Sequence, residues 1–181
     1  MKHYFTRLQE TMKTCWERPA LANFRGEVFT YGEVATQIAK LHVLYEAIGL
    51  KKGDKVALCA KNSARWGIAF FSANTYEAVV VPILADFHPD SVNSLVDHSE
   101  STVLFTDTDI WNKLDITKMP TIKAVISSSD FSLLYAAEDK IQKENVETRN
   151  NAENLVFQCE KTMADAGDKL TEEDKAPINA A

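Results

Sequence analysis

Residues 55–60 read KVALCA and residues 79–83 read VVVPI, and these two short apolar runs decide the fold. The second run is rich in β-branched residues, which is typical of a strand covered on both faces of a parallel sheet. Between the runs, Asn62 and Ser63 supply cap residues, and residues 64–76 carry a helical pattern. A strand, a helix and a second strand in this order predict one right-handed βαβ crossover.

A second helix is predicted before this unit. Thr30 and Glu33 have the spacing of a capping box, in which each side chain bonds to the backbone N–H of the other residue. Gly49 then ends the helix, because glycine adopts the left-handed conformation at least cost. The predicted inward face of this helix consists of Val34, Ile38, Leu41, Tyr45 and Ile48.

The alternation of strands and helices continues after the unit. Pro89 suits the first position of a helix that runs through His98, and residues 102–106 and 124–127 predict two more strands. Residues 1–29 predict an opening helix and a short extended stretch. The fold class predicted from these elements is α/β, with an incomplete parallel (βαβ) sheet.

Apolar sides are predicted on both later helices. Residues 64–76 carry Trp66, Ala69, Phe70 and Ala73 on one side, and on residues 89–98 the inward side chains are Val92, Leu95 and Val96.

Charge divides the chain in two. The 181 residues carry a net charge of −6, of which residues 1–135 contribute −1 and residues 136–181 contribute −5. The later part predicts one long helix over about 138–166, closed by Gly167, and a truncated second helix that Pro177 interrupts. Its apolar stripe consists of Ala152, Leu155, Val156, Cys159, Met163 and Ala166. We therefore predict two domains, residues 1–137 and residues 138–181.

Composition also bears on partners and location. No cluster of Lys and Arg offsets the negative charge, so nucleic acid and anionic lipid are not expected partners. The longest apolar run, residues 78–85, is far below the ~20 residues that span a bilayer, so no transmembrane segment is expected. Arg7, Glu10 and Lys13 stand where a signal peptide would be apolar, and a cytoplasmic protein is expected.

The cysteines and glycines form no recognised motif. Cys15, Cys59 and Cys159 lack the spacing of a metal site or a disulfide framework, and we interpret them as free thiols. No pair of the six glycines has the spacing of a phosphate-binding loop. Residues 127–129, all serine, follow a predicted strand, but no glycine or lysine follows them closely, so a polar turn is favoured over a phosphate site.

Two carboxylate patterns raise the question of a metal. Asp86, His88 and Asp90 occupy alternate positions, as the ligands of a metal ion could. They lie where a helix starts, however, and a helix cap is the favoured interpretation. Asp107 and Asp109 resemble the start of a calcium loop. The calcium interpretation fails because Trp111 and Asn112 occupy the next ligand and glycine positions.

The histidines also suggest no reactive group. We expect His98 at a helix end, where its charge suits the helix dipole, and His3 and His42 at the surface. The chain is therefore predicted to hold no catalytic, cofactor-binding or metal-binding residue.

Residues 24 to about 135 resemble the N-terminal part of the acyl-CoA synthetases, members of the adenylate-forming, AMP-binding ligase superfamily. Within it they are most similar to bacterial long-chain fatty acid ligases. The matching segments, in order, are FTYGEV at 29–34, GLKKGDKVAL at 49–58, NSARW at 62–66, YEAVVVPI at 76–83, HPDSV at 88–92 and HSE at 98–100.

The resemblance implies a reaction. In that family, a fatty acid and Mg-ATP give an acyl-adenylate, and the thiol of coenzyme A then displaces AMP. The phosphate loop, the ribose-binding Asp and the catalytic Lys of the family lie beyond the point that this chain reaches. ATP, Mg and coenzyme A are thus implied for the intact ligase but not for this fragment, which is expected to be inactive alone.

Residues from about 141 to 181 resemble a different family, the helical lid of DnaK-type heat-shock chaperones. The matching blocks are ETRNNAENLVF at 147–157 and AGDKLTEEDKAPI at 166–178. Two resemblances in one chain predict a chimera with its crossover near residues 136–140 and little packing between the parts. The alternatives are a single protein whose last helix merely resembles a lid, a helical module that binds a protein partner, and a product with no selected function. A truncated sheet also leaves an exposed edge through which copies could associate.

Overall fold

The computed structural model describes residues 4–137, which belong to one of the two units into which the chain divides, Met1–Gln142. The helix predicted over about 138–166, the truncated second helix, Cys159, His3 and the second domain lie outside the described residues.

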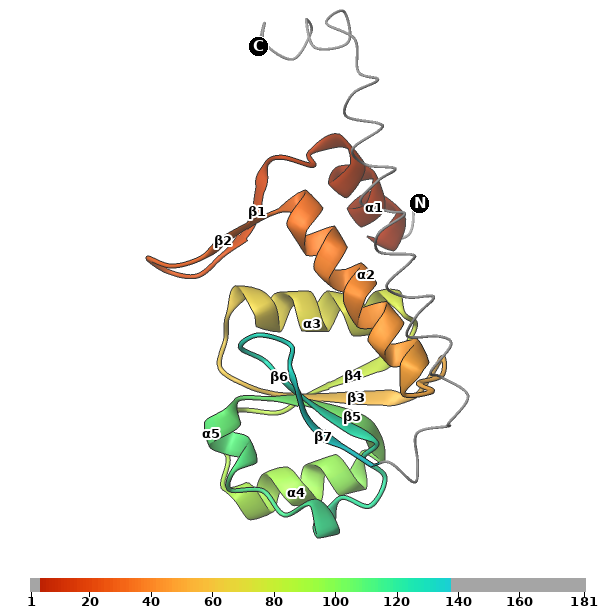
Figure 1. Cartoon of the computed structure of the whole chain (residues 1–181), viewed down its shortest axis with the longest axis vertical. Helices are drawn as coiled ribbons and strands as arrows, with labels where there is room; N and C mark the ends of the chain where they lie inside the picture. Colours follow the sequence, from red (N-terminus) through yellow and green to blue (C-terminus); the bar gives the residue numbers. More distant parts are fainter. Residues whose placement is uncertain (1–3, 138–181) are drawn as a thin grey trace, which may run out of the picture. The chain divides into compact units, whose positions relative to one another are not determined.

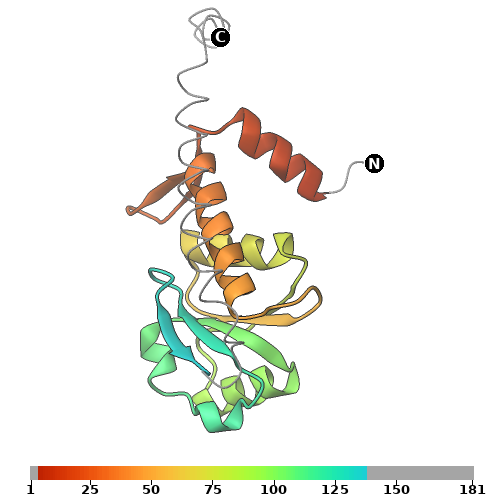
Figure 2. The same cartoon turned by 45° about the vertical axis from the view of Figure 1, so that its right-hand side comes forward.

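A helix and a hairpin form the N-terminal part. The first helix, α1, spans Tyr4–Thr14, and strands β1 (Pro19–Ala22) and β2 (Val28–Thr30) pair as an antiparallel hairpin. The predicted extended stretch is therefore a two-stranded hairpin. Figure 2 shows that α1 lies away from the large sheet, near the start of the next helix, α2.

The capping box is confirmed at the start of α2, which spans Tyr31–Ala47. The Glu33 N–H donates to Thr30 Oγ1 at 3.2 Å, and the Thr30 N–H donates to Glu33 Oε2 at 2.7 Å. Gly49 has a φ of +66° just beyond the helix, a conformation that glycine adopts without strain. All five residues of the predicted inward face are buried.

The predicted βαβ unit is also confirmed. Strand β3 (Lys55–Cys59), helix α3 (Ala64–Thr75) and strand β4 (Val79–Pro82) follow in order, and the two strands are parallel. After them come α4 (Pro89–His98) and β5 (Ser101–Thr106), then the short helix α5 (Thr108–Trp111) and the 3₁₀ helix η1 (Ile116–Lys118), and finally β6 (Ala124–Ser127) and β7 (Leu133–Ala136).

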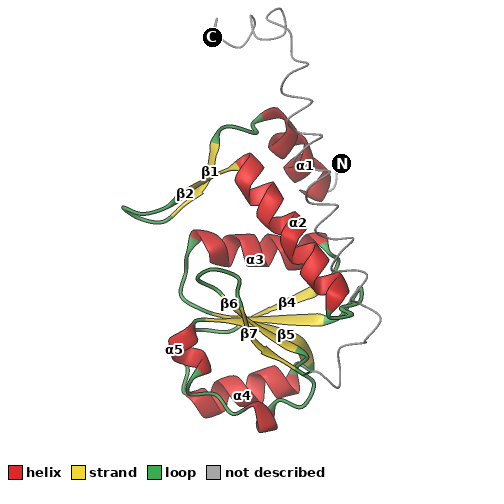
Figure 3. Cartoon of the chain, in the orientation of Figure 1, coloured by secondary structure: helices red, strands yellow, loops and turns green. Residues whose placement is uncertain are grey.

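These strands form one five-stranded sheet in the order β4-β3-β5-β6-β7, in which only β7 runs antiparallel to its neighbour. Helices α2 and α3 lie on one side of this sheet, and α4 and α5 lie on the other (Figures 1 and 3). The predicted α/β class with a mostly parallel sheet is thus confirmed.

The core is split by the sheet into two apolar clusters. On β5, Val103 and Phe105 face the side of α2 and α3, whereas Leu104 faces the side of α4. The same alternation places Val56 and Leu58 of β3 in the first cluster. Because both faces are covered, the middle residues of β3 and β5 are apolar, as the sequence pattern indicated.

The predicted apolar side of α3 is confirmed, since Ala69 and Ala73 belong to the first cluster and Trp66 and Phe70 pack against it. On α3 the fully buried apolar side chains are Ala64, Ile68, Ala69 and Ala73, while Trp66 and Phe70 lie at the edge of the interface and stack on each other with ring centres 5.6 Å apart. The residues that α3 buries are thus mostly small, and its large rings pack at the margin of the cluster.

On α4, Val92 and Val96 are buried as predicted, but the inward prediction for Leu95 is wrong, since Leu95 is 37% exposed and Asn93 is buried. Asn93 Oδ1 accepts a hydrogen bond from the Asp115 N–H at 3.3 Å, so this side of α4 faces the segment before η1.

Candidate functional site

The ends of the parallel strands meet at one edge of the sheet. Strands β3, β5 and β6 end at Cys59, Thr106 and Ser127. From β3 the chain passes through α3 outward to β4, whereas from β5 it continues in the opposite direction to β6. In open α/β sheets, ligands bind outside the carboxyl ends of the strands where the order reverses in this way. The candidate site is therefore the surface above β3, β5 and β6.

One carboxylate joins the loops that follow these three strands. Asp107 Oδ2 accepts a hydrogen bond from the backbone N–H of Lys61 at 2.9 Å, and Asp107 Oδ1 accepts one from the hydroxyl of Ser128. Asp107 also precedes α5, but its side chain does not cap that helix, because both oxygens are used elsewhere. The sequence pattern indicates no such role for Asp107, since its partners are distant along the chain.

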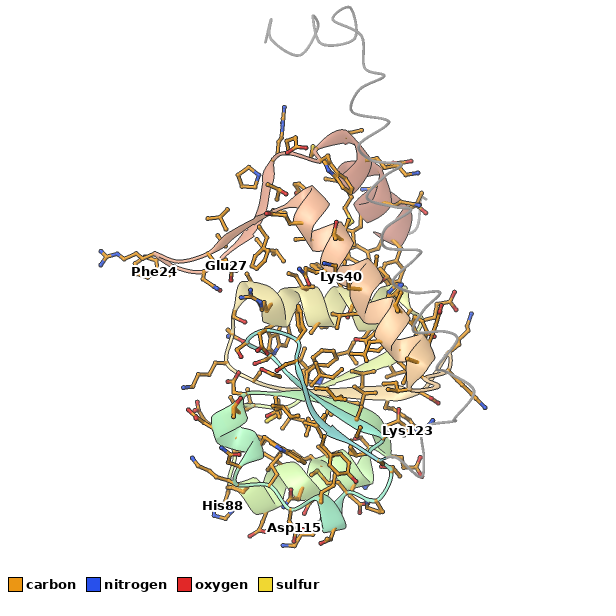
Figure 4. The ribbon with its side chains drawn as sticks, in the orientation of Figure 1. Phe24, Glu27, Lys40, His88, Asp115 and Lys123 are labelled. Carbon is orange, nitrogen blue, oxygen red and sulfur yellow. The ribbon has the colours of Figure 1, made fainter. Side chains whose placement is uncertain are left out.

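The start of α3 is held by the β1–β2 hairpin. Asn23 Oδ1 accepts from the Ala64 N–H at 2.8 Å. Glu27 binds the guanidinium of Arg65 with both oxygens, and the Arg65 guanidinium lies 5.1 Å from the ring centre of Phe29. In Figure 4, Glu27 lies nearer to α3, whereas Phe24 projects from the hairpin tip.

These elements enclose an open pocket of about 450 Å³. Its lining comes from the hairpin, the start of α3, and the loops after β3, β5 and β6: Asn23, Lys61, Ser63, Arg65, Asp107, Thr108, Asp109, Ile110, Ser128 and Ser129. Nine of the ten residues are polar or charged, and Ile110 is the exception. A pocket of this size and polarity can hold a small polar ligand.

The serine run at 127–129, which was predicted to form a polar turn, lies at this pocket. Ser127 and Ser129 are joined through their hydroxyls at 2.8 Å, and Asp130 accepts from the Ser132 N–H and hydroxyl. The bonds from Ser132 hold the pKa of Asp130 below its ordinary value. A polar turn is therefore present, and it contributes Ser128 and Ser129 to the pocket.

The cap interpretation of residues 86–90 is confirmed. His88 is the N-cap of α4, and its Nδ1 accepts from the Asp90 N–H at 3.4 Å. Asp90 pairs with Lys118 at 2.9 Å, and the hydrogen bond and charge of Lys118 lower the pKa of Asp90. Within residues 4–137, no three His, Cys, Asp or Glu side chains are grouped so that they could hold a metal ion.

The surface prediction for His42 is wrong. His42 is half-buried between α2 and α3, where its Nε2 lies 3.0 Å from both Ser72 O and Thr75 Oγ1. Burial is the main cause of the lowered pKa of His42. His98 is exposed in the last turn of α4, as predicted.

Both cysteines in the described part of the chain are free thiols, as predicted. Cys59 is buried, and burial, aided by the charge of Asp107, raises its pKa to about 11. A thiol with this pKa is a poor nucleophile at neutral pH.

A mostly parallel sheet with helices on both sides and a polar pocket at its carboxyl edge defines an open, doubly wound α/β protein. Among such proteins, this chain belongs to the family of AMP-binding enzymes, whose profile matches residues 8–176. That match continues past the predicted crossover at residues 136–140, so it gives no support to a change of family there.

Solved structures of adenylate-forming enzymes have the same fold. An anthranilate CoA ligase in complex with anthranoyl-AMP is 17% identical, with a TM-score of 0.62 over 66% of this chain and 23% of its own. The N-terminal domain of FACL13 from Mycobacterium tuberculosis is 22% identical, with a TM-score of 0.61 over 70% of this chain and 34% of its own.

The N-terminal subdomain of NpsA from Klebsiella oxytoca is 25% identical, with a TM-score of 0.56 over 71% of this chain and 31% of its own. The chain therefore spans no more than about a third of the length of these proteins. Between residues 4 and 137, no helix has the length and apolar character needed to cross a bilayer.

Proposed function

We propose that this chain is the N-terminal part of a ligase that activates a long-chain fatty acid. In that reaction the fatty carboxylate attacks the α-phosphate of ATP, pyrophosphate leaves, and the thiol of coenzyme A then displaces AMP from the acyl-adenylate. The match of residues 8–176 to the AMP-binding enzymes carries the proposal. The ordered sequence blocks between residues 29 and 100 support the long-chain substrate.

By itself the chain is expected to be inactive. Its sequence contains no phosphate loop, and residues 4–137 contain no group of carboxylates that fits Mg²⁺. The Arg65 guanidinium, the one arginine in the pocket, is already held by Glu27. Charge that develops at phosphorus would therefore lack preorganised donors.

An assay with labelled oleate, ATP and coenzyme A tests this proposal. The purified chain should form no oleoyl-CoA, and it should restore oleoyl-CoA formation when mixed with the missing C-terminal portion of a long-chain ligase. Anthranilate serves as the control acid and should not be activated by the mixture. Turnover by the chain alone would refute the predicted inactivity, whereas a mixture that prefers anthranilate would refute the long-chain assignment.

We also propose that copies of the chain associate through the edge of β7. The other edge strand, β4, contains Pro82, which has no N–H to donate to an added strand. Strand β7 contains no proline, and Leu133 on it is 50% exposed. Light scattering should show a larger species for the wild-type chain and a monomer for Leu133→Lys. Val79→Lys is the matched control, since Val79 is 51% exposed on β4.

For residues 138–181 we propose a segment related to chaperone lids, which rests on the blocks ETRNNAENLVF and AGDKLTEEDKAPI alone. Sequencing the transcript across codons 130–150 tests the junction, and a transcript that lacks it would show an artefact of assembly.

If the segment binds a protein partner, Leu155→Asp should reduce capture of a DnaK-type chaperone. Equal capture by the variant would remove the binding role.

A further inference from the structure

Three rings meet where the C-terminal ends of α2 and α3 pack together (Figure 1). The ring centres of His42 and Tyr76 lie 5.2 Å apart, and those of Tyr45 and Tyr76 lie 5.3 Å apart. The Tyr45 hydroxyl lies 2.8 Å from Ser72 Oγ on α3, and the Tyr76 hydroxyl donates to Leu50 O at 3.3 Å. The cluster therefore joins α2, the loop that follows it and the end of α3.

The proton positions on His42 follow from its hydrogen bonds. Its Nε2 atom lies 3.0 Å from both Ser72 O and Thr75 Oγ1. Ser72 O is a carbonyl oxygen and can only accept. The Thr75 hydroxyl gives its own proton to a backbone carbonyl, Phe71 O at 2.7 Å or Ser72 O at 3.2 Å. Nε2 is therefore the nitrogen that carries the hydrogen in neutral His42, and Nδ1 is the nitrogen that takes up a second proton.

The surroundings of Nδ1 do not favour that second proton. Within residues 4–137, Nδ1 has no hydrogen-bond or ion-pair partner, and the imidazole is half-buried. The titratable groups around the ring are Tyr45 and Glu46 of α2 and Tyr76 at the end of α3, and of these only Glu46 is charged at neutral pH. Burial lowers the pKa of His42, and the bond to Ser72 O and the charge of Glu46 offset only part of this effect.

We propose that His42 is a pH-sensitive latch, which holds the end of α3 against α2 while it is neutral and releases it when Nδ1 takes up a proton. The released part is the last turn of α3, where the Tyr76 N–H donates to Ser72 O at 3.0 Å. The Ala78 N–H, just before the edge strand β4, donates to Ala73 O at 3.0 Å and opens with it. In the open state water solvates both N–H groups of the imidazolium, so a falling pH favours opening. This inference is independent of acyl activation, since it rests only on contacts between α2 and α3.

NMR spectroscopy of the ¹⁵N-labelled full chain at pH 7.5 tests the proton assignment. The imidazole signals of His42 should show a protonated Nε2 and a bare Nδ1, and the second proton should add to Nδ1 as the pH falls. His98, which is exposed, should show both tautomers in exchange and serves as the reference. A bare Nε2 on His42 at pH 7.5 would overturn the latch, because the bonds to α3 require a hydrogen there.

Hydrogen exchange of the full chain between pH 7.5 and 5.5, corrected for the intrinsic rate of each amide, tests the release. Protection of the Tyr76 amide should fall by up to about 10-fold, the limit for a histidine that has the ordinary pKa of 6.5 in the open state and stays neutral in the closed state. This exchange should be insensitive to low urea concentrations, which marks local opening rather than unfolding of the whole chain. The Ser99 amide, which donates to Leu95 O at the corresponding end of α4, should keep its protection.

His42→Gln is the decisive variant, because its side-chain amide can still donate to Ser72 O but takes up no proton. Protection of the Tyr76 amide should then no longer depend on pH. His98→Gln is the matched control, since it removes the exposed histidine next to Ser99 and should leave the pH dependence at Tyr76 as in the wild type. An equal fall at Ser99 in the wild type, or a pH dependence at Tyr76 that persists in His42→Gln, would overturn the proposal. The NMR and exchange measurements on the wild type decide it even where the variant is unstable.

Discussion

The indole ring of Trp16 lies against the backbone of Gly32 so closely that no side chain fits between them. A Cβ atom on Gly32 would lie 2.5 Å from both Cε2 and Nε1 of Trp16. The Gly32 N–H also donates to Trp16 O at 2.9 Å. Because Gly32 lies in the first turn of α2, this contact fixes the segment between α1 and the hairpin against that helix.

Gly32→Ala should therefore displace Trp16 and destabilise the chain by about 1–3 kcal/mol, the usual cost of forcing extra volume into a packed site. Urea unfolding, followed by tryptophan fluorescence, measures the effect. Gly67→Ala is the control, since a Cβ there would meet Leu21 Cδ1 at an ordinary 3.4 Å. Alanine favours the interior of α3, so this control should be neutral or stabilising. Equal destabilisation by both substitutions would contradict the Trp16 contact.

Asp107→Ala should loosen the carboxyl edge of the sheet. The change leaves the buried Ser128 hydroxyl and the Lys61 N–H without their acceptor, at a cost of about 1–3 kcal/mol. Hydrogen exchange at the Lys61 amide should become faster, and urea midpoints should fall. Asp109→Ala removes a carboxylate with no partner among the described residues and should stay within about 0.5 kcal/mol of the wild type. A similar fall in both variants would show that Asp107 does not join the loops.

The order and type of the elements could be predicted from the sequence because their signals are local. The capping pair Thr30 and Glu33 lies three residues apart, and the apolar runs of β3 and β4 are continuous. Strand β7 was missed, because its residues 133–136 form a strand only through pairing with β6. The role of Asp107 was missed for the same reason, since Lys61 lies 46 residues before it and Ser128 lies 21 after it.

Stability should depend on pH through His42. In the folded chain the pKa of His42 is lowered, mainly by burial, from its ordinary 6.5. Below pH 6.5 the unfolded chain thus takes up a proton before the folded chain does, so the free energy of unfolding falls as the pH falls from about 6.5 toward the lowered pKa. Above pH 6.5 this contribution is fully present.

Urea titrations between pH 7.5 and 5.5 measure this effect in the wild type and in His42→Gln. The wild-type midpoint should fall over this range, and the variant should show a smaller fall. His98→Gln, at an exposed position, should retain the wild-type pH dependence. An unchanged pH profile in His42→Gln would rule out His42 as the source.

The thiol of Cys59 should react only when the chain opens. Its pKa is raised from 9.0 to about 11, so the thiolate fraction at pH 8 falls about 100-fold, and the side chain is buried as well. A Cys15→Ser, Cys159→Ser variant retains Cys59 as its single thiol. Its reaction with a disulfide reagent at pH 8 should be at least about 100-fold slower than in urea. The matched variant that retains only Cys15, which is half-buried, should react faster in the folded state. Rapid labelling of folded Cys59 would show that the strand end is open to solvent.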